Sequence, residues 1–155
     1  MNKPTALLIF LSAIMLVSCK KHNNDPEPPE QATHVVTGKL YGKDFTFASG
    51  KASREIIDFQ EEGFEIFLSS AKADGCASPD ENFHVIIRTP RKVGKFPDYY
   101  AILADPASSD YAMFTDGNVF EVTSISGNTI KGYLKVTDPE RNSAIEGTFE
   151  ATICN

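Results

Sequence analysis

The segment "TIKGYLKVTDPERNSAIEGTFEATI", residues 129–153, contains the pattern that predicts the fold of this protein. Apolar residues or glycine occupy every second position of 130–136, and the positions between them are Lys131, Tyr133 and Lys135. The same alternation returns over 145–153, where glutamates and threonines separate the apolar residues. A period of two is typical of a β-strand with one buried and one wet face. We therefore expect two antiparallel strands, with Tyr133 facing outward beside the two lysines.

The same period extends over most of the chain and indicates an all-β domain. Dipeptides suited to tight turns, at 116–117 and 127–128, separate the apparent strands before this segment, so residues 111–153 are predicted to form a four-stranded meander. Further strand pairs are expected over 34–49 and 51–70, and another strand over 83–89. The total is about nine or ten antiparallel strands, and no long amphipathic helix is apparent.

The pattern Gly-x-(Leu/Phe) recurs and favours a strongly coiled sheet. It occurs at Gly38, Gly94, Gly132 and Gly147. A glycine inside a strand often marks a bulge or a sharp bend. Coiling brings the two ends of a sheet together and removes exposed edges. We expect a small closed or nearly closed barrel, and a two-sheet β-sandwich remains the alternative because strand count does not separate the two.

The chain begins with the layout of a secretory signal peptide. Lys3 supplies a positive end, residues 6–17 form an uncharged run of twelve, and Ser18 is small. As a helix, this run would span roughly 18 Å, which is too short for a hydrocarbon core of about 30 Å. A transmembrane anchor is therefore the weaker interpretation.

The four residues Leu16-Val17-Ser18-Cys19 resemble the lipobox of bacterial lipoproteins. The resemblance implies that the Cys19 thiol is acylated and that Cys19 becomes the first residue of the mature chain after removal of 1–18. Two or more acyl chains hold a protein stably at a membrane. Lys20, in place of an aspartate, implies the outer membrane. The first acidic residue comes only at Asp25, so the periplasmic face and the cell surface both remain open.

Residues 19–33 then form a spacer, and residues 34–155 form one domain. The spacer is acidic and proline-rich and has no large apolar residue, so we expect it to be disordered. The whole chain has a net charge of −6; without Lys3 it has 14 basic and 21 acidic residues, or −7. An acidic balance argues against nucleic acid as a partner. Membrane contact is therefore expected through the acyl chains alone.

With Cys19 acylated, Cys76 and Cys154 remain and are predicted to form a disulfide. An exported domain meets an oxidising compartment, in which paired cysteines persist as disulfides. Two free thiols, with Cys154 buried at the end of an apolar strand, are the alternative.

No residue pattern points to catalysis, to a cofactor or to a metal. His84 alternates with apolar neighbours and is expected to point outward beside Arg88. Asp74, Asp80 and Glu81 share one loop, but they lack the order of acids and glycine of a calcium loop. The best candidate is an aromatic patch of Phe96, Tyr99 and Tyr100, stiffened by nearby prolines and suited to a protein interface or to sugar stacking. Rings that cap one end of the core are the alternative.

In layout, the chain resembles the small β-rich outer-membrane lipoproteins of Gram-negative bacteria. The leading functional hypothesis is a lipid-anchored binding module for a protein or glycan partner. A barrel that carries a small apolar ligand and a hydrolase of the cell envelope are the alternatives, and the hydrolase is the weakest of the three.

Overall fold

The computed structural model describes residues 33–57, 61–77, 84–96, 101–104, 111–114 and 118–154. These residues form strands and the turns between them, in agreement with the predicted all-β class. The eleven strands are β1 (Thr37–Leu40), β2 (Lys43–Thr46), β3 (Ser49–Ile57), β4 (Glu61–Ser69), β5 (His84–Pro90), β6 (Gly94–Lys95), β7 (Ala101–Ala104), β8 (Tyr111–Phe114), β9 (Val119–Ser126), β10 (Thr129–Asp138) and β11 (Ser143–Cys154).

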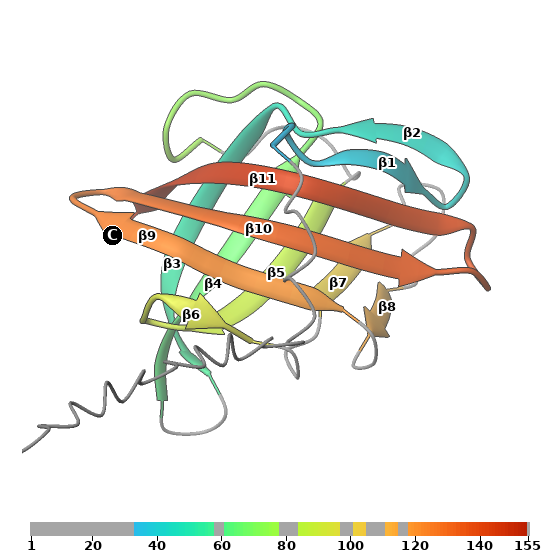
Figure 1. The fold of residues 1–155 in the computed structure, drawn as a ribbon. Helices are drawn as coiled ribbons and strands as arrows, with labels where there is room; N and C mark the ends of the chain where they lie inside the picture. The colour runs from blue at the N-terminus through green and yellow to red at the C-terminus, as the bar shows by residue number, and fades with distance from the viewer. Residues whose placement is uncertain are drawn as a thin grey trace, which may run out of the picture.

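All described strands belong to one hydrogen-bonded sheet. Its order is β6-β9-β10-β11-β3-β4-β5-β7-β8, and the β1–β2 hairpin pairs with β11 beside this path. Figure 1 shows the sheet curled on itself, with β9, β10 and β11 crossing in front of β3, β4 and β5 at a steep angle. The sheet is a half-barrel, because its end strands β6 and β8 do not pair with each other. The prediction of a closed barrel is therefore wrong, and the two-sheet sandwich is not confirmed.

Two predicted strand pairings also differ from the structure. The expected four-stranded meander over 111–153 holds for β9, β10 and β11, but β8 pairs with β7 at the far end of the sheet. The predicted hairpin at 116–117 would require β8 and β9 to be neighbours, so it is wrong. The other difference is a parallel pair, β11 with β3, in which Thr152 lies opposite Lys51. Both choices depend on contacts between distant parts of the chain, which alternation along one strand does not encode.

The core lies on the concave face of the half-barrel. Its largest fully buried side chains include Phe45, Phe64 and Phe120, which come from β2, β4 and β9. The alternation predicted for β10 is confirmed at Ile130, Leu134 and Val136, all of which are buried. The strands β4, β5, β9, β10 and β11 contribute alternate residues to one continuous core.

Tyr133 is the exception to the expected alternation. Its parity is that of the exposed lysines, yet only 6% of the residue is accessible. Its hydroxyl donates a hydrogen bond of 2.6 Å to Glu146 Oε1 on β11. A bond to the neighbouring strand holds the ring against the sheet, and for this reason parity alone misjudged its exposure.

Glycine permits the close approach of the first and last strands. Gly147 has a φ of +144°, and a Cβ atom there would lie 2.6 Å from the backbone of Val35. Val35 forms a bridge with Thr148 just before β1 begins. Gly147 thus leaves room for this close approach. The pairing of β9 with β10 shifts register between Lys131 and Gly132, and Gly132 is another of the glycines that the sequence singled out.

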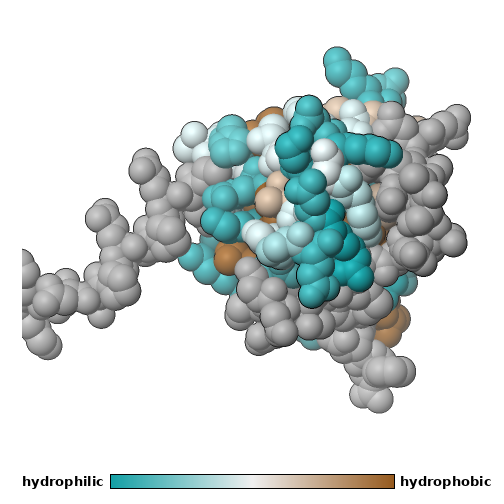
Figure 2. Space-filling model, turned by 90° about the vertical axis from the view of Figure 1, so that its right-hand side faces the viewer, coloured by the Kyte–Doolittle hydropathy of each residue, from teal (hydrophilic) through white to brown (hydrophobic). Residues whose placement is uncertain are grey.

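Ion pairs cover much of the outer surface. The side of the molecule that carries the β1–β2 and β10–β11 turns is mostly hydrophilic across its centre, with hydrophobic colour limited to small patches (Figure 2). Lys39 pairs with Asp44 at 3.0 Å on the β1–β2 hairpin, and Lys135 pairs with Glu146 at 3.0 Å between β10 and β11. Exposed pairs of this kind each contribute little to stability, about 0–1 kcal/mol.

Candidate functional site

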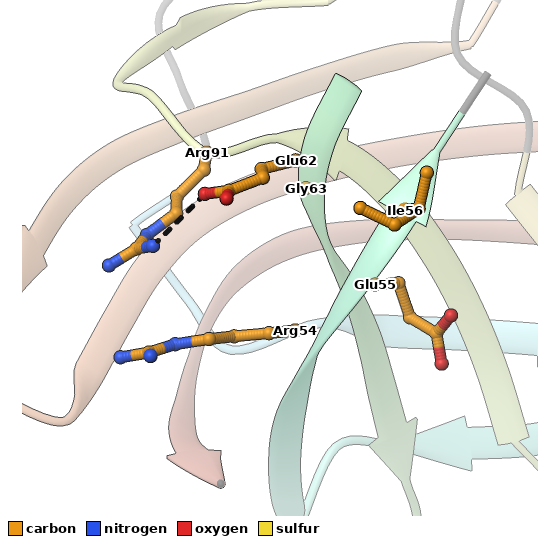
Figure 3. A pocket seen from close by; sticks show the side chains of 6 residues that line it. All are labelled: Arg54, Glu55, Ile56, Glu62, Gly63 and Arg91. Carbon is orange, nitrogen blue, oxygen red and sulfur yellow. Dashed lines mark hydrogen bonds and ion pairs between the residues drawn. The ribbon is translucent and has the colours of Figure 1, made fainter. Parts of the chain in front are cut away.

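A small hollow opens at one end of the concave face. It has a volume of about 210 Å³ and lies between the end of β3, the start of β4 and the turn that follows β5. We call it the arginine hollow; its lining residues are Arg54, Glu55, Ile56, Glu62, Gly63 and Arg91 (Figure 3).

Strand register explains why charged residues lie at this end of the core. Ala52 is opposite Ile66, and both are buried on the concave face. Two residues further along β3, Arg54 is opposite the buried Phe64 and therefore lies on the same face. β11 ends at Cys154, opposite Ser53, and so does not extend over this part of β3. Within the described residues, β4 remains beside this part of β3 but β11 does not.

Two guanidinium groups occupy the hollow. Arg91 Nη1 lies 3.4 Å from Glu62 Oε2, and the Arg91 guanidinium carbon is 5.9 Å from the centre of the Phe64 ring. Phe64 is the residue directly opposite Arg54. Figure 3 shows Arg54 and Arg91 extending toward the same side, whereas Glu55 points to the other side. Arg91 thus lies over the Phe64 ring, and Arg54 lies opposite Phe64 on β3.

One of the two arginines in the hollow has no ion-pair partner among the described residues. Arg54 makes no ion pair with any residue in the described part of the chain, whereas Glu62 is the carboxylate beside Arg91. The lining holds two arginines and two glutamates, and the second glutamate, Glu55, points away from the arginines (Figure 3). A guanidinium group donates two parallel N–H bonds to the two oxygens of a carboxylate, so Arg54 could bind one acidic group.

The volume limits what the hollow could hold. Pockets that enclose a drug-sized ligand measure about 300–1,000 Å³. A hollow of about 210 Å³ is smaller and open to solvent, so it suits one group that projects from a larger molecule.

Two other hollows, each of about 350 Å³, differ from the arginine hollow because their lysines are paired with carboxylates. One lies beside the β10–β11 turn and includes Lys39, which pairs with Asp44. The other lies over Gly132 and includes Lys131, which pairs with Glu150 at 2.8 Å. The cation in each already has a carboxylate partner, in contrast to Arg54.

The predicted aromatic patch is only partly described by the structure. Phe96 is 6% accessible and belongs to the core, where its ring centre lies 6.5 Å from that of Phe120. It therefore contributes to packing and offers little surface to a partner. Tyr99 and Tyr100 lie outside the described residues, so their role in binding stays a prediction.

The remaining polar candidates do not meet in one place. His84 has the outward parity that the sequence predicts, but its ring stacks on Phe67 with 4.4 Å between the ring centres. Arg88, four residues further along β5 and on the same face, forms an ion pair with Glu65 at 2.8 Å. Asp74 is exposed, whereas Asp80 and Glu81 lie outside the described residues.

The described residues contain neither a cluster of metal-ligating side chains nor a long apolar helix. Nowhere in them do three or more histidine, cysteine or acidic side chains gather as metal ligands would. No helix there has the length and apolar character that crossing a membrane requires.

The predicted disulfide is present. Cys76 and Cys154 have their sulfur atoms at bonding distance and their Cα atoms 5.7 Å apart. The bridge joins the loop after β4 to the last described residue of β11. Cys19, the predicted site of lipid attachment, lies outside the described residues.

Sequence reasoning missed Arg54 and Arg91, although one signal was present. Ala52, Arg54 and Ile56 share the same parity in β3, so an arginine stands at a position that the alternation assigns to the concave face. A charged residue at such a position indicates either the end of the core or a site. The arrival of Arg91 beside it depends on the turn after β5, which no local pattern predicts.

Comparison with known proteins adds no relative from which a function could be transferred. No family model matches this chain, and neither the curated proteins nor the solved structures include a match.

Proposed function

We propose that this protein is a lipid-anchored binding module of the bacterial outer membrane, which captures a protein or glycan partner. Its anchor would be Cys19, acylated within the motif Leu16-Val17-Ser18-Cys19. Residues 20–33 would hold the domain away from the bilayer, at up to roughly 40 Å for an extended spacer.

The observation that carries this proposal is the arginine hollow. Arg54 has no ion-pair partner within the described chain and lies beside Arg91. Ile56, in the same hollow, is 64% accessible and is the most exposed large apolar side chain among the described residues. Exposed apolar and arginine side chains side by side are typical of surfaces that bind a partner.

Photo-crosslinking in intact cells tests the position of the binding surface. A photoreactive residue at Ile56 is expected to give discrete adducts, and the same residue at Val119, which is also exposed, serves as the control. The adducts at position 56 should decrease in an Arg54→Gln background. Equal adducts at both positions, or adducts that do not respond to Arg54→Gln, would contradict the proposed surface.

Replacement of the anchor residue tests the localisation. Cys19→Ser should leave the signal peptide uncut or release the protein from the membrane fraction, because no thiol remains for acylation. Fractionation of cells, with mass spectrometry of the mature N-terminus, measures both results. A processed Cys19→Ser protein that sediments with the outer membrane like the wild type would disprove the anchor.

A further inference from the structure

The arginine hollow includes the last part of β3, where only one backbone edge has a strand neighbour among the described residues. β3 pairs with β4 along its whole length, but on its other edge it pairs with β11 only over Lys51–Ser53. For the residues that follow, 54–57, no described strand lies on that edge. Unpaired N–H and C=O groups at a strand edge are a template for another extended chain.

The side chains along this open edge form an alternating pattern that a partner strand could match. Arg54 and Ile56 lie on the concave face, and Glu55 lies on the opposite face. In a sheet, residues directly opposite each other on adjacent strands have Cβ atoms about 4.5–5.5 Å apart. A strand added here would therefore place two side chains, two positions apart, next to Arg54 and Ile56.

We propose that an extended peptide segment of a partner protein adds to this edge of β3, with one carboxylate against Arg54 and Arg91 and one apolar side chain against Ile56. The inference rests on the proposed function and names the ligand class of the same surface. The open edge favours a peptide over a glycan, because a peptide has the alternating N–H and C=O groups that the edge requires.

Charge complementarity limits the number of acidic side chains in the partner peptide. Arg54, the arginine of the hollow that has no ion pair within the described residues, matches one carboxylate. The chain as a whole carries a net charge of −6, which would repel a strongly acidic segment. The preferred sequence is accordingly apolar-x-Glu, with neutral residues around it.

The test uses the full mature protein with its anchor, purified in detergent, and three synthetic pentapeptides. The first is acetyl-Val-Thr-Glu-Thr-Val-amide, the second has Gln in place of Glu, and the third keeps Glu but has N-methylated amides on one edge. Amide chemical shifts should identify the contacted residues, and titration should give the dissociation constants. We expect the Glu peptide to shift the amides of 55–57 and to bind about tenfold more tightly than the Gln peptide.

Variants of the protein separate recognition of the Glu side chain from backbone pairing with β3. Arg54→Gln and Arg91→Gln should remove most of the preference for Glu over Gln, while the shifts at 55–57 remain. Lys72→Gln, which removes an exposed cation from the loop after β4, should retain the preference. The N-methylated peptide should lose binding to every form of the protein.

Three results would overturn the inference. The Glu and Gln peptides could bind equally, the N-methylated peptide could bind as well as its parent, or a galacturonate disaccharide could displace the peptide and bind more tightly. If crosslinks at Ile56 still depend on Arg54 in such a case, the binding surface stands and only the ligand class is wrong. If no peptide binds and no crosslink forms, the charges on this edge serve only to prevent aggregation, and both proposals fail.

Discussion

The two halves of the β3–β4 hairpin have the same backbone pairing but opposite surroundings. In one half, Ala52 and Ile66 face each other and are fully buried under the rest of the half-barrel. In the other half, Ile56 faces Glu62, and Ile56 is 64% accessible. The difference begins where β11 ends, opposite Ser53. Whether a strand residue serves the core or a surface is thus decided by the neighbouring strand as much as by its own alternation.

The disulfide lies at the boundary between these halves and should have the largest effect. Joining Cys76 to Cys154 closes a loop with a sequence separation of 78, for which the chain-entropy model gives about 4 kcal/mol of stability. We expect Cys76→Ser with Cys154→Ser to lower the free energy of unfolding by up to that amount. Denaturant unfolding of both proteins, with a thiol titration of the denatured wild type, measures this. Two titratable thiols in the wild type would contradict the pairing.

Matched isoleucines test the difference between the halves directly. Ile66→Ala should destabilise the protein by about 2–5 kcal/mol because it leaves a cavity in the core. Ile56→Ala should change stability by no more than about 0.5 kcal/mol, as is usual for an exposed site. The midpoints of urea unfolding report both values. A large loss from Ile56→Ala would show that this half of the hairpin is covered in the folded protein.

Glycines with positive φ provide a second matched pair. Gly147, at φ +144°, has the backbone of Val35 where a Cβ would lie, whereas Gly127, at φ +59°, has open space around it. We expect Gly147→Ala to cost about 3 kcal/mol and Gly127→Ala about 1 kcal/mol, because only the first adds a steric clash to the backbone strain. Thermal and urea unfolding should rank them in that order. Equal losses would mean that β11 can move away from the segment before β1.

The smallest expected effect concerns the outer face, where Tyr133 is buried against β11. Burial, together with the hydrogen bond to Glu146, raises the pKa of Tyr133 to about 12. A group whose pKa is raised by folding stabilises the folded state below its unfolded pKa, about 10 for tyrosine, and this contribution is lost as the pH rises toward 12. Wild-type stability should therefore fall more steeply between pH 9.5 and 12 than that of Tyr133→Phe.

Glu146, the acceptor of this hydrogen bond, should affect the stability of the protein at low pH. The hydrogen bonds from Tyr133 and Lys135 lower the pKa of Glu146. A lowered pKa gives stability that is present above the unfolded value, about 4.3 for glutamate, and is lost as the pH falls through the folded value. Glu146→Gln should accordingly flatten the acid limb of the pH–stability curve. An unchanged acid limb in this variant would show that the bond contributes nothing to folding.

The sequence by itself determined the class of the fold and much of the inner face. Alternation identified Ile130, Leu134 and Val136 as core residues, and Gly127-Asn128 as the turn between two paired strands. The expectation of export, with two cysteines besides Cys19, predicted the Cys76–Cys154 bridge. These features depend on residues near each other in the chain or on chemistry that needs no geometry, so they can be read without a structure.

Only the tertiary structure decided which strands became neighbours, and the arginine hollow follows from that choice. The end of β11 opposite Ser53 leaves the last residues of β3 uncovered, and the turn after β5 brings Arg91 over the ring opposite Arg54. The sheet also stops as a half-barrel, with β8 beside β7. Alternation has the same period in all strands, so it does not indicate which strand a given strand will pair with. Pairing depends instead on the summed contacts of segments far apart in the chain.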